Sequence, residues 1–285
     1  MNAGSPILWL LEIASASFAG GVVGAISGLG GGIVIVPVLT IFMGVPINQA
    51  IGASIVSVIA VSSGAGSVYV KDRVTNVRIA MFLELSTAAG ALVGAAALAP
   101  IIPARLLYIL FGILLLLSLV PIFAKFGEEL PENVTPDRMS RFLRLGDSYF
   151  DKRLNREIQY NVTGIPAALG IMFVAGIISG ILGIGAGVVK VLAHEIAMKV
   201  PTKVSTATSN FMIGVTAAAA AGVYLRRGWV LPFLVVPVAT AVLAGAMLGT
   251  IIMERLSNNM IRKIFAAALA IIGIQMLVHG LRGSL

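Results

Sequence analysis

Ten apolar segments divide this chain, and their lengths constrain its fold more than any other feature. They fall at about residues 6–27, 31–43, 48–70, 76–99, 104–124, 160–182, 186–198, 204–225, 229–252 and 260–281. A helix needs about 20 apolar residues to cross the hydrocarbon core, and its backbone polar groups are then paired within the helix itself. Only 11% of the residues are charged, whereas a soluble domain carries about 25%. The sequence therefore predicts an all-α, polytopic transmembrane bundle with eight to ten membrane segments.

A glycine-rich motif occurs twice, in equivalent places of the two apolar halves. The first copy is Gly28-Leu29-Gly30-Gly31-Gly32, followed by Val45-Pro46 and Ser54. Adding 155 to each number gives Gly183-Ile184-Gly185-Ala186-Gly187, Val200-Pro201 and Ser209. Because no gap is needed, we expect two homologous repeats in which residues 18–99 superpose on residues 173–254.

The second segment of each half, 31–43 or 186–198, is too short to cross a bilayer comfortably. Each is a short or tilted span, a re-entrant piece, or the second part of a helix broken at the glycines. The distribution of Lys and Arg favours ten crossings, which gives an odd number per half and hence inverted repeats. That arrangement places Tyr69 and Tyr224 on opposite sides of the membrane. Eight crossings with parallel repeats remain the alternative.

Three regions follow from this pattern: a first transmembrane repeat (1–124), a polar cytoplasmic linker (125–159) and a second transmembrane repeat (160–285). Residues 1–6 contain no Lys or Arg, so the first apolar run is expected to be a retained span and not a cleaved signal peptide. In the linker, Thr135 is expected to cap a helix that starts at Pro136. Apolar residues at near-helical spacing then predict an amphipathic helix at the membrane surface; they are Met139, Phe142, Leu143, Tyr149, Phe150 and Leu154. Two roles remain open for residues 125–159: a solvated linker between the halves, and a regulatory or partner-binding element.

Several classes of function are excluded by composition. The absence of cysteine rules out thiolate metal sites and thiol chemistry, and two histidines do not make a His-rich metal site. No nucleotide-binding loop and no nucleophile–base motif are present, so we expect neither catalytic residues nor cofactors nor a metal. The net charge of +8 arises mainly from cations in short loops, which act as orientation signals and not as a nucleic-acid surface.

The glycine clusters and the polar stretches after each Val-Pro form the candidate binding site. Glycines let a helix break and bring peptide groups close to a ligand, and hydroxyls and amides near a helix start can donate hydrogen bonds to an oxyanion. Close packing by glycine and hydrogen bonding between helices by Ser and Thr are the structural alternatives. The candidates are Gly30, Gly31, Gly32, Asn48, Gln49 and Ser54 in the first half, and Gly185, Gly187, Lys190, Thr206, Thr208, Ser209 and Asn210 in the second.

Few ionisable residues lie within the apolar segments, and each is a functional candidate because a charge in the bilayer centre costs about 3 kcal/mol. Lys190 and His194 are four residues apart and share a helix face. Lys190 attracts a transported anion, pairs with a carboxylate such as Glu84, or snorkels to an interface. Glu84, His194 and Glu195 are candidates for proton coupling, and Glu84 can equally serve a hydrogen bond between helices.

These motifs resemble the sulfite exporter TauE/SafE family of membrane permeases. The resemblance rests on the doubled glycine clusters, the two Val-Pro pairs, the run Ala50-Ile51-Gly52-Ala53-Ser54 and the Ala207-Thr208-Ser209 of the second half, and it covers nearly the whole chain. It implies export or uptake of sulfite, sulfoacetate or other sulfonates without ATP hydrolysis. The chain departs from the pattern at Ala186, which replaces a glycine, and at Leu192, which stands where the first copy has Pro37.

We therefore expect a multi-pass cell-membrane protein that is a secondary transporter of small sulfur-containing anions, with alternating access and ion coupling. An anion channel and a non-transporting membrane scaffold are the alternatives. The expected partners are a small anionic substrate and the lipid bilayer, and we expect no binding to nucleic acid. Whether the protein forms a homodimer is left open by the sequence. The two glycine clusters are expected to converge near the bilayer midplane, facing each other across a cavity.

Overall fold

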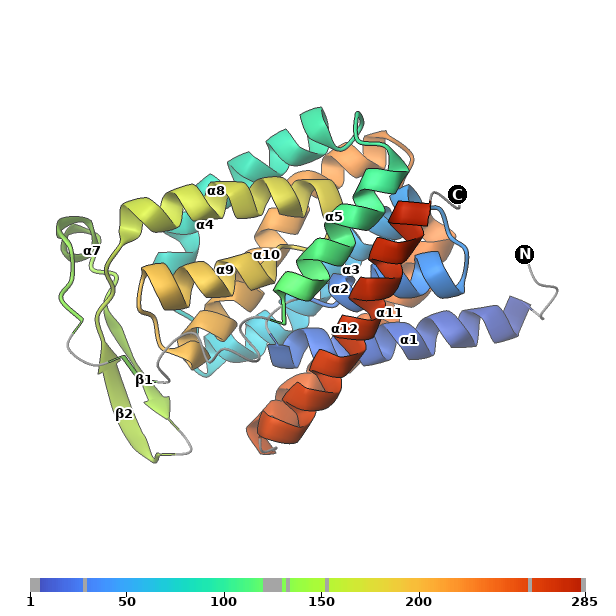
Figure 1. Cartoon of the computed structure of the whole chain (residues 1–285). Helices are drawn as coiled ribbons and strands as arrows, with labels where there is room; N and C mark the ends of the chain where they lie inside the picture. The colour runs from blue at the N-terminus through green and yellow to red at the C-terminus, as the bar shows by residue number, and fades with distance from the viewer. Residues whose placement is uncertain are drawn as a thin grey trace.

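The chain forms a helical bundle with a small two-stranded sheet at one end (Figure 1). The structure is a computed structural model that describes residues 6–27, 30–119, 130–131, 134–151, 154–255 and 258–282. The first half contains α1 (Pro6–Ser27), α2 (Gly32–Pro37), the π-helical turn η1 (Val38–Phe42), α3 (Ile47–Lys71), α4 (Val77–Val93), the π-helical turn η2 (Gly94–Leu98) and α5 (Ala104–Leu117). The linker contains α7 (Arg138–Phe142), β1 (Asp147–Asp151) and β2 (Arg156–Tyr160). The second half contains α8 (Ile165–Leu182), α9 (Gly187–Leu192), the π-helical turn η3 (Ala193–Ala197), α10 (Thr202–Arg226), α11 (Pro232–Arg255) and α12 (Asn258–Arg282).

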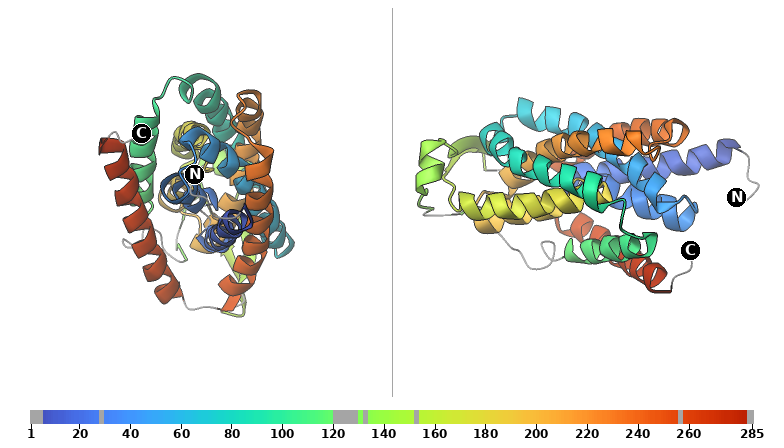
Figure 2. Two further views of the ribbon diagram at one scale, coloured as in Figure 1. Left: turned by 90° about the vertical axis from the view of Figure 1, so that its right-hand side faces the viewer. Right: turned by 90° about the horizontal axis from the view of Figure 1, so that it is seen from above.

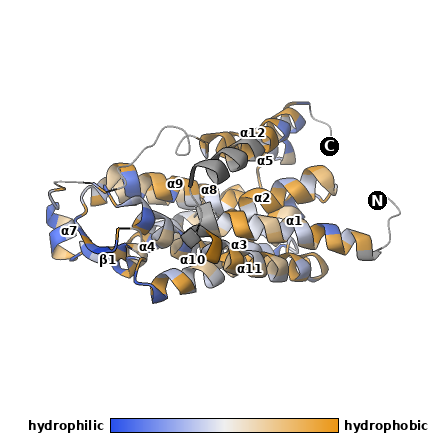
Figure 3. Cartoon of the chain, turned by 90° about the horizontal axis from the view of Figure 1, so that it is seen from below, coloured by the Kyte–Doolittle hydropathy of each residue, from blue (hydrophilic) through white to orange (hydrophobic). Residues whose placement is uncertain are grey.

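In the described part of the chain, six helical stretches are long and apolar enough to cross a membrane. They lie in α1, α3, α4 with η2, α8, α10 and α11. Large apolar side chains point outward from them, such as Leu85, 74% exposed, and Phe233, 65% exposed. Hydrophilic residues instead gather at the end that holds α7 and β1 (Figure 3). The chain is therefore a multi-pass membrane protein, as the apolar segments predict.

The two longest central helices, α3 and α10, run antiparallel. Ser62 in α3 donates a hydrogen bond to the carbonyl of Asn210 in α10, 2.6 Å away. Gly52, ten residues earlier, packs on the carbonyl of Trp229, beyond the end of α10. Tyr69 and Tyr224, near the last turns of α3 and α10, consequently lie at opposite ends of this pair. Three elements of the first half have the same bounds as elements of the second half after a shift of 155 residues: α2 corresponds to α9, η1 to η3 and α3 to α10.

Helices from different halves pack in two parallel pairs, α1 with α11 and α4 with α8. A Cβ atom added at Gly90 of α4 would lie 2.2 Å from the carbonyl oxygen of Phe173 in α8. The equivalent atom at Gly245 of α11 would lie 2.1 Å from the carbonyl oxygen of Phe18 in α1. Glycines at such interfaces let helix backbones approach closely. A third pair, α5 with α12, stands at one side of the bundle (Figure 2).

Gly90→Ala is expected to lower the melting temperature of the purified protein. The added methyl group meets backbone and not a flexible side chain, and such overpacking costs about 1–3 kcal/mol. Gly170→Ala in α8 is the matched control, because nothing lies within 4 Å of a Cβ there. The control should be neutral or stabilising by about 0.5–1 kcal/mol, since alanine favours a helix over glycine. Equal melting temperatures for the two variants would contradict the close pairing of α4 with α8.

Both glycine clusters break their helices. Helix α8 ends at Leu182, its cap Gly183 has φ 66°, and Gly185 and Ala186 follow at φ 75° and 47° before α9 begins. In the first half, Gly30 has φ 82°; Gly28 and Leu29 lie outside the described residues. The left-handed region is open to glycine and unusual for other residues. The short second segments are therefore separate helices that start after a break.

The linker differs from the amphipathic helix predicted between Thr135 and Leu154. The helix is capped by Asp137, whose carboxylate accepts a hydrogen bond from the Ser140 amide at 2.6 Å, and it ends at Phe142. Gly146 interrupts the helical pattern, and residues 147–151 pair with residues 156–160 as two antiparallel strands. In β1, Tyr149 is buried and Phe150 is 54% exposed, the alternation of a strand and not of a helix.

The hairpin is fastened to the ends of the helices. Asn76, which caps α4, donates to the Leu145 carbonyl and to the Tyr160 hydroxyl, both at 2.9 Å. Burial raises the pKa of this Tyr160 hydroxyl above its usual value, so it stays neutral. Lys203 in the first turn of α10 pairs with Asp151 of β1 at 2.9 Å. The linker thus anchors two membrane helices at the same end of the bundle.

Candidate functional site

The two helix breaks meet in the interior of the bundle. A Cβ added at Gly32 would lie 3.4 Å from the carbonyl oxygen of Gly183, and one at Gly30 would lie 3.4 Å from that of Ile184. Gly30, Gly32 and Gly183 are all buried. Segments about 155 residues apart in the sequence are therefore in contact through their unwound backbones, an arrangement tolerated in a membrane only inside protein or beside water.

Two apolar side chains fill the space around this contact. They are Val58 of α3 and Ile213 of α10, which occupy equivalent positions 155 residues apart. A Cβ added at Gly185 would lie 2.8 Å from the Ile213 Cβ and 3.1 Å from a Val58 methyl carbon. In this conformation the breaks touch directly and have no room for a side chain between them, so the cavity predicted between the clusters is closed.

Serine hydroxyls bind carbonyl groups at the break of the second half, one just after α8 and one in the first residue of α9. Ser54 donates to the Gly183 carbonyl at 2.8 Å, and Ser209 donates to that of Gly187 at 3.4 Å. Both side chains are fully buried. The Gly183 carbonyl, which lies outside both helices, needs such a partner because lipid offers none. Ser54 and Ser209 are thus the predicted hydroxyls that reach the breaks.

Other candidates from the polar stretches lie elsewhere. Asn48 and Gln49 are half-buried in the first turn of α3. Thr206 is buried near the start of α10, and Thr208 accepts a hydrogen bond from the Asn76 amide at 3.1 Å. Asn210 donates to the Ala25 carbonyl at 3.3 Å, whereas its Oδ1 has no partner among the described residues. The stretch after each Val-Pro therefore spreads over several contacts and does not form one cluster.

The buried charges form a second cluster. Lys190 of α9 is fully buried, and its Nζ lies 3.5 Å from Oε2 of Glu84 in α4. Lys190 also donates to the hydroxyl of Thr216 in α10, which in turn donates to Oε1 of Glu84. Of the roles open to Lys190, the structure shows the pairing with Glu84. One hydrogen-bonded ion pair therefore joins α4 of the first half to α9 and α10 of the second half.

His194 and Glu195 follow Lys190 on the turn η3. His194 is fully buried, and neither ring nitrogen makes a hydrogen bond of good geometry with a described residue, although the backbone of Ser205 lies beside the ring. Glu195 is also buried, at 4% exposure. Of these two candidates, His194 stands one helical turn from Lys190 on the same face.

Thr216 was missed by the sequence reasoning. It stands directly before the alanine run 217–221. The hydroxyl of a lone threonine in an apolar helix ordinarily forms a hydrogen bond to its own backbone or to a neighbouring helix. The Thr216 hydroxyl also lies 3.0 Å from the Met212 carbonyl one turn back, so its single O–H is shared between that carbonyl and Glu84. Its spacing of seven residues from Ser209, two turns on one face, is the signal that could have revealed it.

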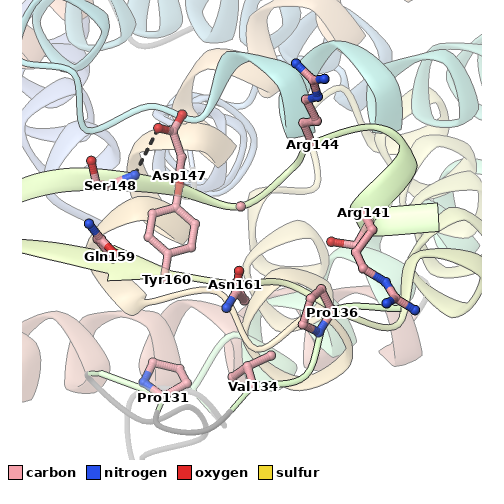
Figure 4. A pocket seen from close by; sticks show the side chains of 12 residues that line it. Pro131, Val134, Pro136, Arg141, Arg144, Asp147, Ser148, Gln159, Tyr160 and Asn161 are labelled. Carbon is pink, nitrogen blue, oxygen red and sulfur yellow. Dashed lines mark hydrogen bonds between the residues drawn. The ribbon is translucent and has the colours of Figure 1, made fainter. Parts of the chain in front are cut away.

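A hollow on the surface lies at the linker and not at the helix breaks. It has a volume of about 710 Å³ and is lined by residues of α7, the hairpin and the loops beside them (Figure 4). Arg141 and Arg144 contribute cations, and Asp147 contributes a carboxylate that accepts from the Ser148 amide at 2.9 Å. This hollow is separate from both interior clusters.

Membrane-length helices, two broken segments that meet inside the bundle and a polar end cap define a polytopic permease. The chain belongs to the sulfite exporter TauE/SafE family, whose model matches residues 13–276. It is also similar to the probable membrane transporter protein YunE of Bacillus subtilis (strain 168), with 26% identity over 273 residues that cover 92% of this chain and 94% of that protein. No solved structure matches the chain.

Proposed function

We propose that this permease is a secondary transporter of small sulfur-containing anions, such as sulfite, sulfoacetate or other sulfonates, with alternating access and ion coupling. The observation that carries the proposal is the meeting of two helix breaks at the centre of antiparallel helices α3 and α10. Broken helices that meet at a repeat interface are typical of substrate sites in secondary transporters. Family membership supports the transport of sulfur oxyanions.

We further propose that the two halves are inverted repeats, related by an axis in the membrane plane. The parallel pairs support this symmetry, because Gly90 on Phe173 and Gly245 on Phe18 are the same contact shifted by 155 residues in each partner. Tyr69 donates to the Ala25 carbonyl, and Tyr224 donates to the Gly180 carbonyl, again 155 residues on. Inverted halves that exchange conformations alternate the access to a site between them.

The proposed substrate site lies between the breaks. When Val58 and Ile213 withdraw, the amides of the unwound backbone and the hydroxyls of Ser54 and Ser209 become available to an oxyanion. Both hydroxyls bind carbonyl groups in the closed conformation, so the substrate would compete with the bonds that keep the site shut.

Ser54→Ala is expected to reduce anion uptake into proteoliposomes by roughly tenfold, equivalent to about 1.4 kcal/mol. The variant loses the hydroxyl that bridges the halves at the break. Thr240→Ala is the matched control, because the partners of the exposed Thr240 hydroxyl within the described residues are carbonyls of its own helix, Val236 and Pro237. Saturable uptake with counterflow by the wild-type protein supports a carrier. Uptake that does not saturate indicates a channel, and the absence of flux for sulfite and sulfonates indicates a scaffold.

A further inference from the structure

The ion pair between Lys190 and Glu84 joins the two halves beside a helix break. Glu84 belongs to α4 of the first half, and Lys190 belongs to the short α9, which begins five residues after α8 ends at Leu182. Lys190 is fully buried and Glu84 is 5% exposed. The pair therefore holds the broken segment of the second half against a membrane helix of the first half.

The pair has no counterpart in the other half. The positions 155 residues away from Lys190, Glu84 and Thr216 are Ile35, Ala239 and Val61. Ile35 and Val61 are buried side chains with no polar atom. The two halves therefore share their helix breaks, but only one of the two equivalent locations holds charge.

Buried charge must stay balanced through a transport cycle. An uncompensated ion in a low-dielectric interior is costly, and a buried pair that loses one partner is strongly destabilised. Lys190 can leave Glu84 without such a penalty only if an anion replaces the carboxylate and a proton neutralises it. Glu84 Oε2 accepts no well-formed hydrogen bond from the residues that the structure describes, so it is the oxygen at which an O–H bond can form.

We propose that the Lys190–Glu84 pair is a latch that one proton and one singly charged anion open together. The proton binds Glu84 Oε2 as the anion binds the Lys190 ammonium, and α9 is released from α4. Departure of the anion and the proton restores the pair. The buried site carries zero net charge before and after each exchange, so the cycle moves no net charge across the membrane. The inference rests on the proposed transport function and adds its coupling ion, its stoichiometry and the charge of its substrate.

The ionisable groups near the pair add no second proton to the stoichiometry of one proton per anion. His194 faces the same side as Lys190, and a charged imidazole there would repel the ammonium and leave its N–H groups poorly paired. Glu195 follows His194 on η3 and already takes part in a polar or electrostatic interaction within the structure. Helix α8 and the turn η2 contain no ionisable side chain. Those of α10 are at its ends: Lys203, Tyr224 and Arg226.

The substrate class follows from the charge balance. Hydrogensulfite and simple sulfonates such as methanesulfonate carry one negative charge and satisfy one ammonium. Sulfate, sulfite and sulfoacetate carry two, and the second charge would be buried without a partner. The latch therefore favours singly charged sulfur anions, and it narrows the proposed substrates from sulfite, sulfoacetate and other sulfonates to hydrogensulfite and simple sulfonates.

The test uses wild-type protein in proteoliposomes, with methanesulfonate and sulfoacetate as matched probes. A pH gradient, acid outside, should drive methanesulfonate accumulation, and a potassium-diffusion potential imposed without a pH gradient should leave uptake unchanged. Sulfoacetate uptake should be at least about tenfold slower, or about 1.4 kcal/mol. Methanesulfonate uptake driven by the potential alone, or equal rates for the two probes, would overturn the latch but leave a transporter. No uptake of any sulfur anion would overturn the transport function itself.

Variants then test Glu84 directly. Glu84→Gln should keep methanesulfonate exchange between the two sides but lose accumulation driven by the pH gradient, and Glu84→Asp, which retains a proton-binding carboxyl, should keep it. Ser86→Ala is the control, because it removes a hydrogen bond of 2.8 Å between α4 and α8 without touching a charge. Retained pH-driven accumulation in Glu84→Gln overturns the proposal. The wild-type measurement decides the matter even where Glu84→Gln does not fold.

Discussion

Replacing Glu84 with Gln is expected to destabilise the protein more than replacing Glu84 and Lys190 with Gln together. The single change strands the Lys190 ammonium, which is fully buried, and breaking a buried pair costs about 3–5 kcal/mol. The double change removes both charges, and a neutral replacement of a buried pair is often tolerated or stabilising. Thermal melting of the purified single and double variants measures the coupling energy between the two charges.

The pair of Lys203 and Asp151, in which only the lysine reaches solvent, is the matched control. Its atoms are closer, at 2.9 Å against 3.5 Å, and Asp151 is as buried as Glu84, but the Lys203 side chain is 35% exposed whereas the Lys190 side chain is 0% exposed. Water reaches the Lys203 ammonium and screens the pair, so the same cycle with Gln and Asn should give a smaller coupling energy than the cycle at Lys190 and Glu84. Burial, and not distance, then decides the energy. If the destabilisation of the Glu84/Lys190 double variant equals the sum of the destabilisations of the two single variants, the two charges are not coupled.

The apolar segments and the glycine breaks could be predicted because they are properties of local sequence. Segment length against bilayer thickness places each helix, and Gly183 and Gly185 mark the positions where the backbone leaves the helical region. The pairing of Lys190 with Glu84 was one of the roles weighed, since few partners exist for a charge in the membrane. These inferences need no knowledge of which helices are neighbours.

The remaining features depend on contacts between distant elements. Nothing local shows that α1 packs on α11, or that Thr216 completes the ion pair from α10. The linker hairpin was missed for a different reason. Its side chains Tyr149 and Phe150 fit a helical period counted from Met139. Only Gly146 marks the point where the pattern changes from helical spacing to the alternation of a strand.

A disulfide between cysteines at positions 64 and 246 is expected to stop transport. The chain contains no cysteine, so Gly64→Cys with Ala246→Cys creates a single pair. A Cβ at Gly64 lies 3.8 Å from the Ala246 Cβ, which matches the mean Cβ separation of about 3.8 Å in disulfides. The nearest obstacle is a terminal carbon of Leu243 at 2.9 Å, the flexible end of a side chain that can rotate away.

This bond would fix α11 to α3, and α11 carries α1 through the close glycine contacts at Gly245 and Gly21. Alternating access by inverted halves requires packed helix groups to rock against the centre, so the crosslink removes a motion that the proposed cycle needs. Oxidised double-cysteine protein should lose at least about tenfold of its anion uptake, or about 1.4 kcal/mol, and reduction should restore it. Each single-cysteine variant, treated with the same oxidant, should transport normally. Fully crosslinked protein with normal uptake would mean that α1, α3 and α11 move as one body, so that the motion that exposes the site falls to α4, α8 and the α9 segment held by Lys190.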